Sequence, residues 1–356
     1  MPVDLRAIFG NVLHLFKSRA NQICAASCDG LVLRMHYRWT FCLLMGMFLT
    51  VWYSWYYRDV ISCVSHFNSE TQVRLDYINI CLSYPYVQEE DGTRRYPLFY
   101  RWVGWALFFL LAVFSIPKVL VGIFDNGQCS SLLQELSTKA RCHKEQGHEL
   151  AETAARYMRL NLNTHNGLFW KFLAANLVAL FIDVFAIEFL DIVLQNRFSQ
   201  YGHAGYPYDK DPQNFTDVLS QTFPPFVQCE LTSDHSVVNK RVERFGCHLT
   251  FMELYEKMFL ALWYWFVLLA VAAGCYIVFL SVMWLPIVRE RVLRPAKPAI
   301  VEEDVGDVVA RALRRCKLGD VYVLYRIKSR VSHGQFFDIL KRMADPNFLK
   351  EDVGCA

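Results

Sequence analysis

The sequence predicts an all-α membrane protein with four transmembrane helices, disulfide-containing outer loops and a helical cytoplasmic domain. Of its 356 residues, 54% are hydrophobic, 15% are aromatic and only 20% are charged, which is more apolar than an ordinary soluble domain. The apolar residues gather in four long blocks, and cysteines fall in pairs between them. Each block approaches or exceeds the ~20 residues that a helix needs to cross the hydrocarbon core.

The chain begins with a segment, residues 1–38, that lacks a sustained apolar core. We therefore expect no signal peptide, and the first apolar block serves as the insertion signal. This block, residues 39–57, is uncharged between Arg38 and Arg58. It ends in a cluster of tryptophan and tyrosine, which is typical of a membrane interface.

The second block, residues 100–123, carries Pro117 near its far end, where neighbouring helices can satisfy the carbonyl that a proline leaves free. Arg101 stands at its start between two aromatic residues. Two interpretations remain open. The guanidinium is tolerated at the interface beside the anchoring Tyr100 and Trp102, or it makes a charge-assisted hydrogen bond to an acidic residue of an outer loop such as Asp59.

The third block, residues 170–194, is the most polar, and the fourth, residues 258–285, has no charged residue. An ionisable group inside a span is a functional candidate because it is costly in lipid. We expect Glu188 and Asp191 to approach the outer interface. Asp183 is either the partner in a buried hydrogen bond or a residue facing a water-filled cavity.

The distribution of charge predicts the orientation. The first 38 residues hold five Lys/Arg against two Asp/Glu, and residues 286–356 hold 14 against 10. The loops at 58–99 and 195–257 hold 4 against 6 and 6 against 8. By the positive-inside rule both termini and the loop at 124–169 are cytoplasmic, and the other two loops are extracellular.

The cysteines and the one sequon agree with this orientation. The two outer loops contain four of the twelve cysteines, namely Cys63, Cys81, Cys229 and Cys247. An even set in an oxidising compartment indicates two disulfides, although spacing leaves three pairings open. We expect the other eight to be free thiols. Asn214 begins the sequon Asn-Phe-Thr, also in an outer loop, and is a candidate glycosylation site whose occupancy stays open.

The cytoplasmic tail shows helical periodicity. In "VGDVVARALRRC", residues 305–316, the apolar positions recur on one face, and "FFDILKRM" repeats the pattern. The middle loop from 131 to 159 is rich in helix-forming residues. The basic charges of the tail are either a solvated face or a contact with anionic lipid.

Two classes of function are weighed against each other: a large-pore channel subunit, and an enzyme or carrier built on the same four helices. No nucleophile, acid–base or metal-ligand motif occurs, and the ten histidines are scattered. A carrier is expected to show repeats with broken spans in matching positions, and only the second span is broken. We therefore expect no catalytic or metal site and no cofactor. Four helices cannot enclose a wide aqueous path, so a channel must be an oligomer.

Several runs of residues resemble the innexins, the pannexin-related gap-junction family of invertebrates. The run from Phe99 through Tyr100, Arg101, Trp102 and Val103 is similar to the family signature Tyr-Tyr-Gln-Trp-Val. Further runs sit where innexins carry similar ones: "RMHYRWT", "LFFLLAVFSIPKVL", "FSQYG", "TFPPFVQC", "EKMFLALWYWF" and "KLGDVYVLY". Connexins, which also have four spans, normally place three cysteines in each outer loop, whereas this chain has two in each, and this difference separates it from connexins. The chain departs from innexins at Asp59, which remains alone of the usual Gly-Asp-Pro, and at Arg101, which replaces glutamine.

The resemblance implies a function and a set of sites. Innexin subunits form rings of about eight, alone or mixed with other innexins, and two rings dock to pass ions and small metabolites between cells. An undocked hemichannel that releases small molecules such as nucleotides is the alternative. The resemblance also implies disulfide-linked extracellular loops, with Cys63 bonded to Cys247 and Cys81 to Cys229. It implies a pore funnel formed by the N-terminal segment, so that Asp4 and Arg6 are candidates for lining the pore. Asp59, at the outer end of the first span, is a further pore-lining candidate.

Overall fold

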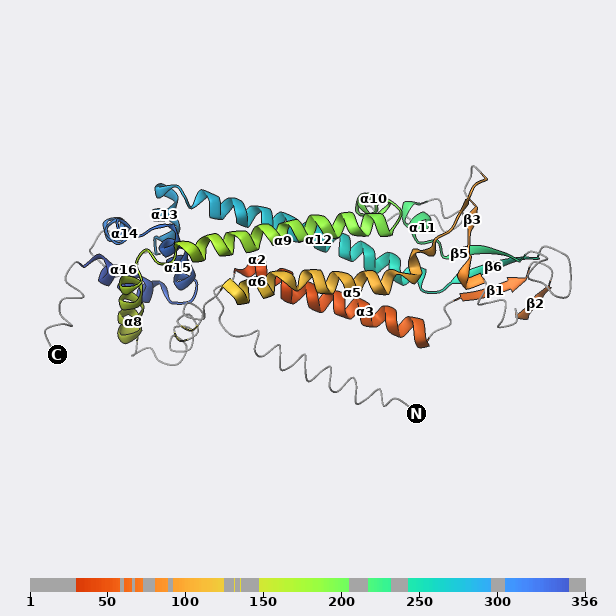
Figure 1. The fold of residues 1–356 in the computed structure, drawn as a ribbon, viewed down its shortest axis with the longest axis horizontal. Helices are drawn as coiled ribbons and strands as arrows, with labels where there is room; N and C mark the ends of the chain where they lie inside the picture. The colour runs from red at the N-terminus through yellow and green to blue at the C-terminus, as the bar shows by residue number, and fades with distance from the viewer. Residues whose placement is uncertain are drawn as a thin grey trace, which may run out of the picture. The chain divides into compact units, whose positions relative to one another are not determined.

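A computed structural model describes residues 30–57, 61–65, 68–72, 81–88, 92–124, 131, 135, 147–204, 217–231, 243–295 and 305–345. The chain divides into two compact units (Figure 1). Unit 1 contains Met1–Gly30, Val119–Asn176 and Tyr276–Ala356, and unit 2 contains Leu31–Lys118 and Leu177–Cys275.

Long apolar helices dominate the chain. Three helical segments are long and apolar enough to cross a membrane: Val103–Phe124, formed by α5 (Val103–Phe114) and α6 (Ile116–Phe124); α9 (Asn166–Val193); and α12 (Met252–Val282). The spans predicted at 100–123, 170–194 and 258–285 thus lie within or beside helices that begin up to six residues away from the expected positions. The prediction of an apolar, mainly helical membrane protein is confirmed in this coarse form.

The first predicted span forms a helix but is not among those three. After α2 (Leu31–Arg34) and a π-helical turn η1 (Met35–Trp39), α3 runs from Thr40 to Tyr57. It is the shortest of the long helices, and its last six residues include five tryptophans and tyrosines. Such rings prefer the interface to the hydrocarbon core, and so they lower the apolar character of the whole segment.

The second span is broken between α5 and α6. Ser115 separates the two helices, and Pro117, which is buried, is the second residue of α6. Proline has no N–H to continue the helical ladder. Ser115 compensates in part, since its hydroxyl donates to the Leu111 carbonyl at 2.8 Å and its N–H reaches the carbonyls of Ala112 and Val113.

Unit 2 contains β-structure that an all-α prediction omits. Four strands pair in the order β2-β1-β6-β5, all antiparallel, and two short strands, β3 (Val87–Gln88) and β4 (Arg94–Arg95), pair separately. We call the four-stranded sheet the cysteine sheet: β1 (Ile61–Ser65), β2 (Asn68–Gln72), β5 (Phe226–Leu231) and β6 (Glu243–Leu249). Shorter elements are η2 (Leu98–Arg101), α10 (Phe198–Ala204) and α11 (Val218–Thr222).

Unit 1 contains a cluster of shorter helices (Figure 1). They are α8 (Gly147–Leu160), α13 (Pro286–Leu293), α14 (Val305–Leu313), α15 (Leu318–Lys328) and α16 (His333–Ala344). Of these, α8, α14 and α16 are amphipathic. The predicted helix at 305–316 is confirmed as α14, which buries Val305, Val308, Val309 and Ala312. α16 packs against α8 and α14, where Arg342 pairs with Glu152 at 3.0 Å.

Candidate functional site

The cysteine sheet has two chemically different faces because side chains alternate along each strand. On β6, Phe245, Cys247 and Leu249 are buried, whereas Arg244 and Gly246 are exposed. On β5 the buried positions are Val227 and Cys229. One face of the sheet is thus buried and carries the cysteines among apolar side chains, and the other face is exposed to solvent.

Two disulfides join β6 and β5 to the first cysteine-bearing loop, which includes β1. Cys63 on β1 lies directly opposite Cys247 on β6 and is bonded to it, with the Cα atoms 4.0 Å apart. Cys81, in a helical turn at 81–83, is bonded to Cys229 on β5. Each bond closes a long stretch of chain, since the sequence separations are 184 and 148. These are the pairs that the family resemblance implies.

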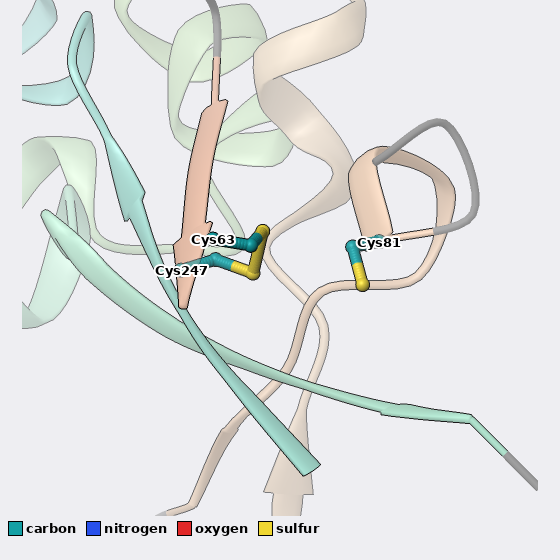
Figure 2. A group of neighbouring side chains, drawn as sticks. All are labelled: Cys63, Cys81 and Cys247. Atoms are coloured by element: carbon teal, nitrogen blue, oxygen red, sulfur yellow. A yellow bond between two sulfur atoms is a disulfide. The ribbon is translucent and has the colours of Figure 1, made fainter. Parts of the chain in front are cut away.

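Cys81 lies near the disulfide between Cys63 and Cys247 (Figure 2). The sulfur atoms of Cys63, Cys81 and Cys247 all lie within 4.8 Å of one another, a spacing that three metal ligands would also adopt. A metal is bound by thiolate, however, and these three sulfurs are all engaged in S–S bonds. The cluster therefore acts as a covalent core.

The open face of the sheet carries a shallow cavity and a charged group. The cavity has a volume of about 480 Å³ and is lined by Ser62, Tyr86, Phe226, Gln228 and His248 among others. Beside it, Glu230 accepts from Arg94 at 2.6 Å and lies 3.6 Å from Arg244. Glu230 raises the pKa of Arg94, whose guanidinium also stands 4.7 Å above the Tyr86 ring.

The signature residues at the start of α5 have different environments. Tyr100 is 1% exposed, so the expectation that it anchors the membrane interface is wrong. Its hydroxyl donates to the Leu82 carbonyl, one residue after Cys81, and its ring packs on Phe251 at 5.4 Å. Tyr100 therefore ties the start of α5 to the turn that holds a disulfide.

The neighbours of Tyr100 differ in exposure. Trp102 is 64% exposed, and Val103 is fully buried as the first residue of α5. The interfacial role of Trp102 stays a prediction. Arg101 is exposed. No ion pair of Arg101 is found with any residue that the structure describes, and Asp59 lies outside those residues.

A buried polar pair lies among the apolar helices of unit 2. His36 Nδ1 lies 3.2 Å from Asp183 Oδ1, and both side chains are fully buried. The Phe114 ring is stacked beside the imidazole, with centroids 6.2 Å apart. Neither side chain makes a hydrogen bond of good geometry to another described residue. Asp183 is therefore buried beside a polar partner, as the first of its two interpretations expects, but without the hydrogen bond of good geometry that this interpretation included.

Sequence reasoning missed His36 as the partner of Asp183. The histidine was visible within "RMHYRWT", but no local pattern connects it to an aspartate on α9. The turn that positions it is closed by Thr40, whose hydroxyl donates to the Met35 carbonyl at 3.0 Å and accepts from Trp265 Nε1 at 2.9 Å. Asp191, the acidic residue nearest the end of α9, has a different role: its carboxylate accepts a hydrogen bond from Ser199 N at 2.8 Å and so caps the start of α10.

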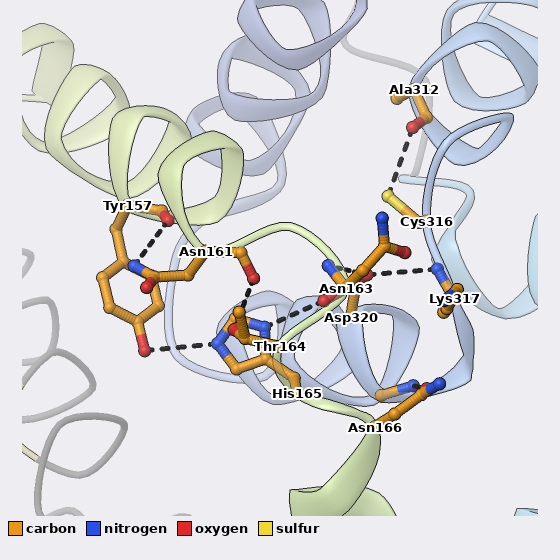
Figure 3. Close-up of polar contacts among 11 residues, drawn as sticks. Tyr157, Asn161, Asn163, Thr164, His165, Asn166, Ala312, Cys316, Lys317 and Asp320 are labelled. Carbon is orange, nitrogen blue, oxygen red and sulfur yellow. Dashed lines mark hydrogen bonds and ion pairs between the residues drawn. The ribbon is translucent and has the colours of Figure 1, made fainter.

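A second polar network in unit 1 connects the start of α9 to α15 (Figure 3). Asp320 contacts His165 Nδ1 at 2.8 Å and accepts from the backbone N–H of Asn163 and of Lys317 at 3.0 and 3.1 Å. On the other side of the imidazole, the Tyr157 hydroxyl lies 3.3 Å from Nε2. Asp320 is the aspartate of "KLGDVYVLY". This run therefore fixes the start of α15 against the residues that precede α9.

Cys316 lies beside this network (Figure 3). Burial, and secondarily Asp320, raises the pKa of its thiol to about 12. Because the thiolate is the reactive form, this cysteine is inert near neutral pH. Cys42 and Cys275 are also free, in agreement with the expectation of unpaired thiols.

Several predicted site residues lie outside the described residues: Asp4, Arg6, Asp59 and the sequon at Asn214. Their roles stay predictions. Pro117 lies at the break between α5 and α6.

Comparison with known proteins gives one consistent result. The sequence model of the family described as Innexin matches residues 29–346. Innexin inx2 of Drosophila melanogaster is 25% identical over 345 residues, which cover 91% of each chain. Innexin inx3 of the same species is 23% identical, over 89% of this chain and 84% of the relative, and innexin shaking-B is 22% identical, over 94% and 95%.

Proposed function

The chain belongs to the innexin family, a gap-junction and channel-forming family without enzymatic activity, and from this we propose that it is a subunit of an oligomeric large-pore gap-junction channel passing ions and small metabolites between adjacent cells. The observation that carries the proposal is the family match across residues 29–346. The two disulfides and the three apolar helices support it.

The proposed subunit crosses the plasma membrane four times, with both termini in the cytoplasm. α3 is the fourth spanning helix in addition to the three apolar ones, and its aromatic end lies in the interface. The excess of Lys and Arg in residues 1–38 and 286–356 supports this orientation. So does the position of both disulfides in the two loops on the opposite side, because disulfides persist in an oxidising compartment.

The proposed pore lies on the axis of a ring. Innexin family members form gap-junction oligomers, and a bundle of four helices that buries its own core leaves no wide path inside one subunit. We propose a ring of about eight subunits, alone or mixed with other innexins. The N-terminal segment, with Asp4 and Arg6, lines it, and Asp59 lies at its outer mouth.

Docking to an opposing ring proceeds through the cysteine-bearing loops. The disulfides make the cysteine sheet a preorganised surface, which lowers the entropic cost of association. Its open face presents charged and aromatic groups, Arg94, Arg244, Glu230 and Phe226, to an approaching partner. The second candidate function, an undocked hemichannel, is favoured by the sequon at Asn214, because a glycan there is bulky.

Paired-cell recording beside single-cell dye uptake tests the proposal. Two cells that both express the chain should show junctional conductance, and isolated expressing cells should take up a small dye when the channel opens. The matched control is a pair in which only one cell expresses the chain. Dye uptake without junctional conductance would favour the hemichannel. Absence of both, with the protein at the cell surface, would contradict a channel formed by this chain alone.

A further inference from the structure

The end of α12 in unit 1 has the features of a membrane interface. Trp284 follows α12 and is 63% exposed, and it packs edge-on against Trp170, 51% exposed, with ring centroids 6.1 Å apart. Paired exposed tryptophans are typical of the depth of the lipid headgroups. The next residues, Leu285 and Ile287, are 56% and 77% exposed. An apolar surface of this kind, continuous with a spanning helix, is suited to contact with lipid chains.

The short helix α13 is held firmly at this level. The Arg289 guanidinium donates to the carbonyls of Met283 and Trp284 at 2.9 and 3.0 Å, which closes the end of α12. At the other end of α13, Lys328 Nζ donates to the carbonyls of Val292 and Arg294 at 2.7 and 2.8 Å. The residues on α13 are therefore presented in a fixed orientation directly after the spanning helix.

A cavity of about 190 Å³ lies between α13 and α14. It is lined by Ile287, Glu290, Arg291, Arg294, Gly306 and Val309. Ile287, Glu290 and Arg291 recur at helical spacing and thus share one face of α13, and Arg294 directly follows the last residue of that helix. Arg291 and Arg294 are both exposed, and neither guanidinium has a hydrogen bond or ion pair with the residues that the structure describes. Two exposed guanidiniums beside a small cavity are a charge arrangement that favours an anionic ligand.

We propose that this cavity binds the headgroup of an anionic phospholipid, with Arg291 and Arg294 on the phosphate and Ile287 beside the acyl chains. Guanidinium groups match phosphate oxygens in a bidentate geometry, and the volume suits one phosphate group with a small substituent. The exposed apolar residues beside the cavity favour a lipid over a soluble phosphate compound, which would leave Leu285 and Ile287 in water.

Glu290 on the cavity wall refines the choice of headgroup. Its carboxylate opposes a bare phosphate but can accept a hydrogen bond from an ammonium or hydroxyl group. Phosphatidylserine offers two anionic groups, its phosphate and its carboxylate, for the two arginines and an ammonium for Glu290. The site therefore prefers phosphatidylserine to phosphatidylcholine, whose choline has no N–H to donate.

The test uses the full-length protein in detergent, titrated with dioctanoyl-phosphatidylserine, dioctanoyl-phosphatidylcholine and glycerophosphoserine, the free headgroup. Exchange of both arginines, Arg291→Gln with Arg294→Gln, should weaken dioctanoyl-phosphatidylserine binding about thirtyfold, if each basic residue contributes about 1 kcal/mol near an anionic lipid. The matched control, Arg314→Gln with Arg315→Gln, removes two exposed arginines that do not line the cavity and should change binding less than about threefold.

A third variant separates the lipid from its headgroup. Ile287→Ser should weaken the binding of dioctanoyl-phosphatidylserine and leave glycerophosphoserine binding unchanged. Equal affinity for the serine and choline lipids, or equal loss in both arginine pairs, would overturn the site. Glycerophosphoserine binding as tightly as the lipid would overturn the assignment to a membrane component. All measurements are made on protein that elutes as the unaltered chain does in gel filtration, and none depends on channel activity.

Discussion

At the scale of single residues, Tyr100 and Arg101 show how adjacent positions acquire different functions. Both belong to η2, a 3₁₀ helix, in which successive side chains point about 120° apart. Tyr100 is turned into the core of unit 2, where its hydroxyl reaches the Leu82 carbonyl. Arg101 is turned outward. The buried tyrosine is constrained by packing, whereas the departure from glutamine at Arg101 costs the fold little.

The His36–Asp183 pair leads to a prediction at the same scale. Asp183→Asn and His36→Gln should each destabilise the protein, because each leaves a polar partner buried among apolar helices. In a double-mutant cycle the coupling energy should be about 0.6 kcal/mol, the average measured for polar contacts between membrane helices, and no more than the maximum of about 1.7 kcal/mol. The measurement is the free energy of unfolding of the purified protein in mixed micelles.

The control for this cycle is Glu188→Gln, which changes an exposed carboxylate on the same helix. It should alter the free energy of unfolding by no more than about 0.5 kcal/mol. A coupling energy near zero would mean that each group finds an equivalent partner elsewhere, and the pair would not stabilise unit 2.

At the scale of elements, β6 shows how one strand can serve two surfaces. Its odd-numbered residues, Phe245, Cys247 and Leu249, bury apolar surface and a disulfide. Its even-numbered residues, Arg244, Gly246 and His248, line the open face. Since the period of a strand is two, a shift of register by one residue would reverse both surfaces. The bond from Cys247 to Cys63 prevents such a shift.

The arrangement of the disulfides predicts non-additive stability. The chain closed by Cys81–Cys229 is nested within the chain closed by Cys63–Cys247. When one disulfide is present in the unfolded chain, the second closes only a short loop, which consists of residues 63–81 and 229–247. The entropy of loop closure then predicts about 4 kcal/mol for loss of either bond and about 9 kcal/mol for loss of both.

The measurement is the thermal stability of paired serine variants: Cys63→Ser with Cys247→Ser, Cys81→Ser with Cys229→Ser, and all four together. The loss in the fourfold variant should exceed the sum of the two separate losses. Cys42→Ser, which removes a free exposed thiol, is the control and should have little effect. Strict additivity would indicate that the two bonds constrain separate parts of the unfolded chain.

At the scale of the whole molecule, the sequon at Asn214 predicts how the assembled channel behaves. A glycan repeated around the proposed ring, on the loop through which docking is proposed, would hold two membranes apart because it is bulky and hydrated. Asn214→Gln should therefore leave single-cell dye uptake about the same and raise junctional conductance, or at least not lower it. Dual voltage clamp of paired cells measures this effect.

Two further variants separate the glycan from the asparagine itself. Thr216→Ala also removes the sequon and should act as Asn214→Gln does, whereas Thr216→Ser keeps the sequon and should behave as the unaltered chain. A loss of conductance in Asn214→Gln with normal surface delivery would show that Asn214 assists docking, and the steric argument would be wrong.

Sequence alone determined those properties that depend on local composition and period. Runs of apolar residues identified three membrane-length helices, and helical spacing identified α14 with its buried Val305, Val308 and Val309. The family resemblance named the cysteine partners. These signals are local, or are carried by short motifs, and so they can be read without a structure.

Tertiary structure decided which distant groups meet. The cysteine sheet was not foreseen because its strands are short and lie within polar loops. Nor does any local pattern join His36 to Asp183 or His165 to Asp320, and Tyr100 has the same aromatic character whether it faces lipid or the core. Such contacts depend on the path of the whole chain. They are settled by packing and by the cost of burying unpaired polar groups, which only the folded molecule resolves.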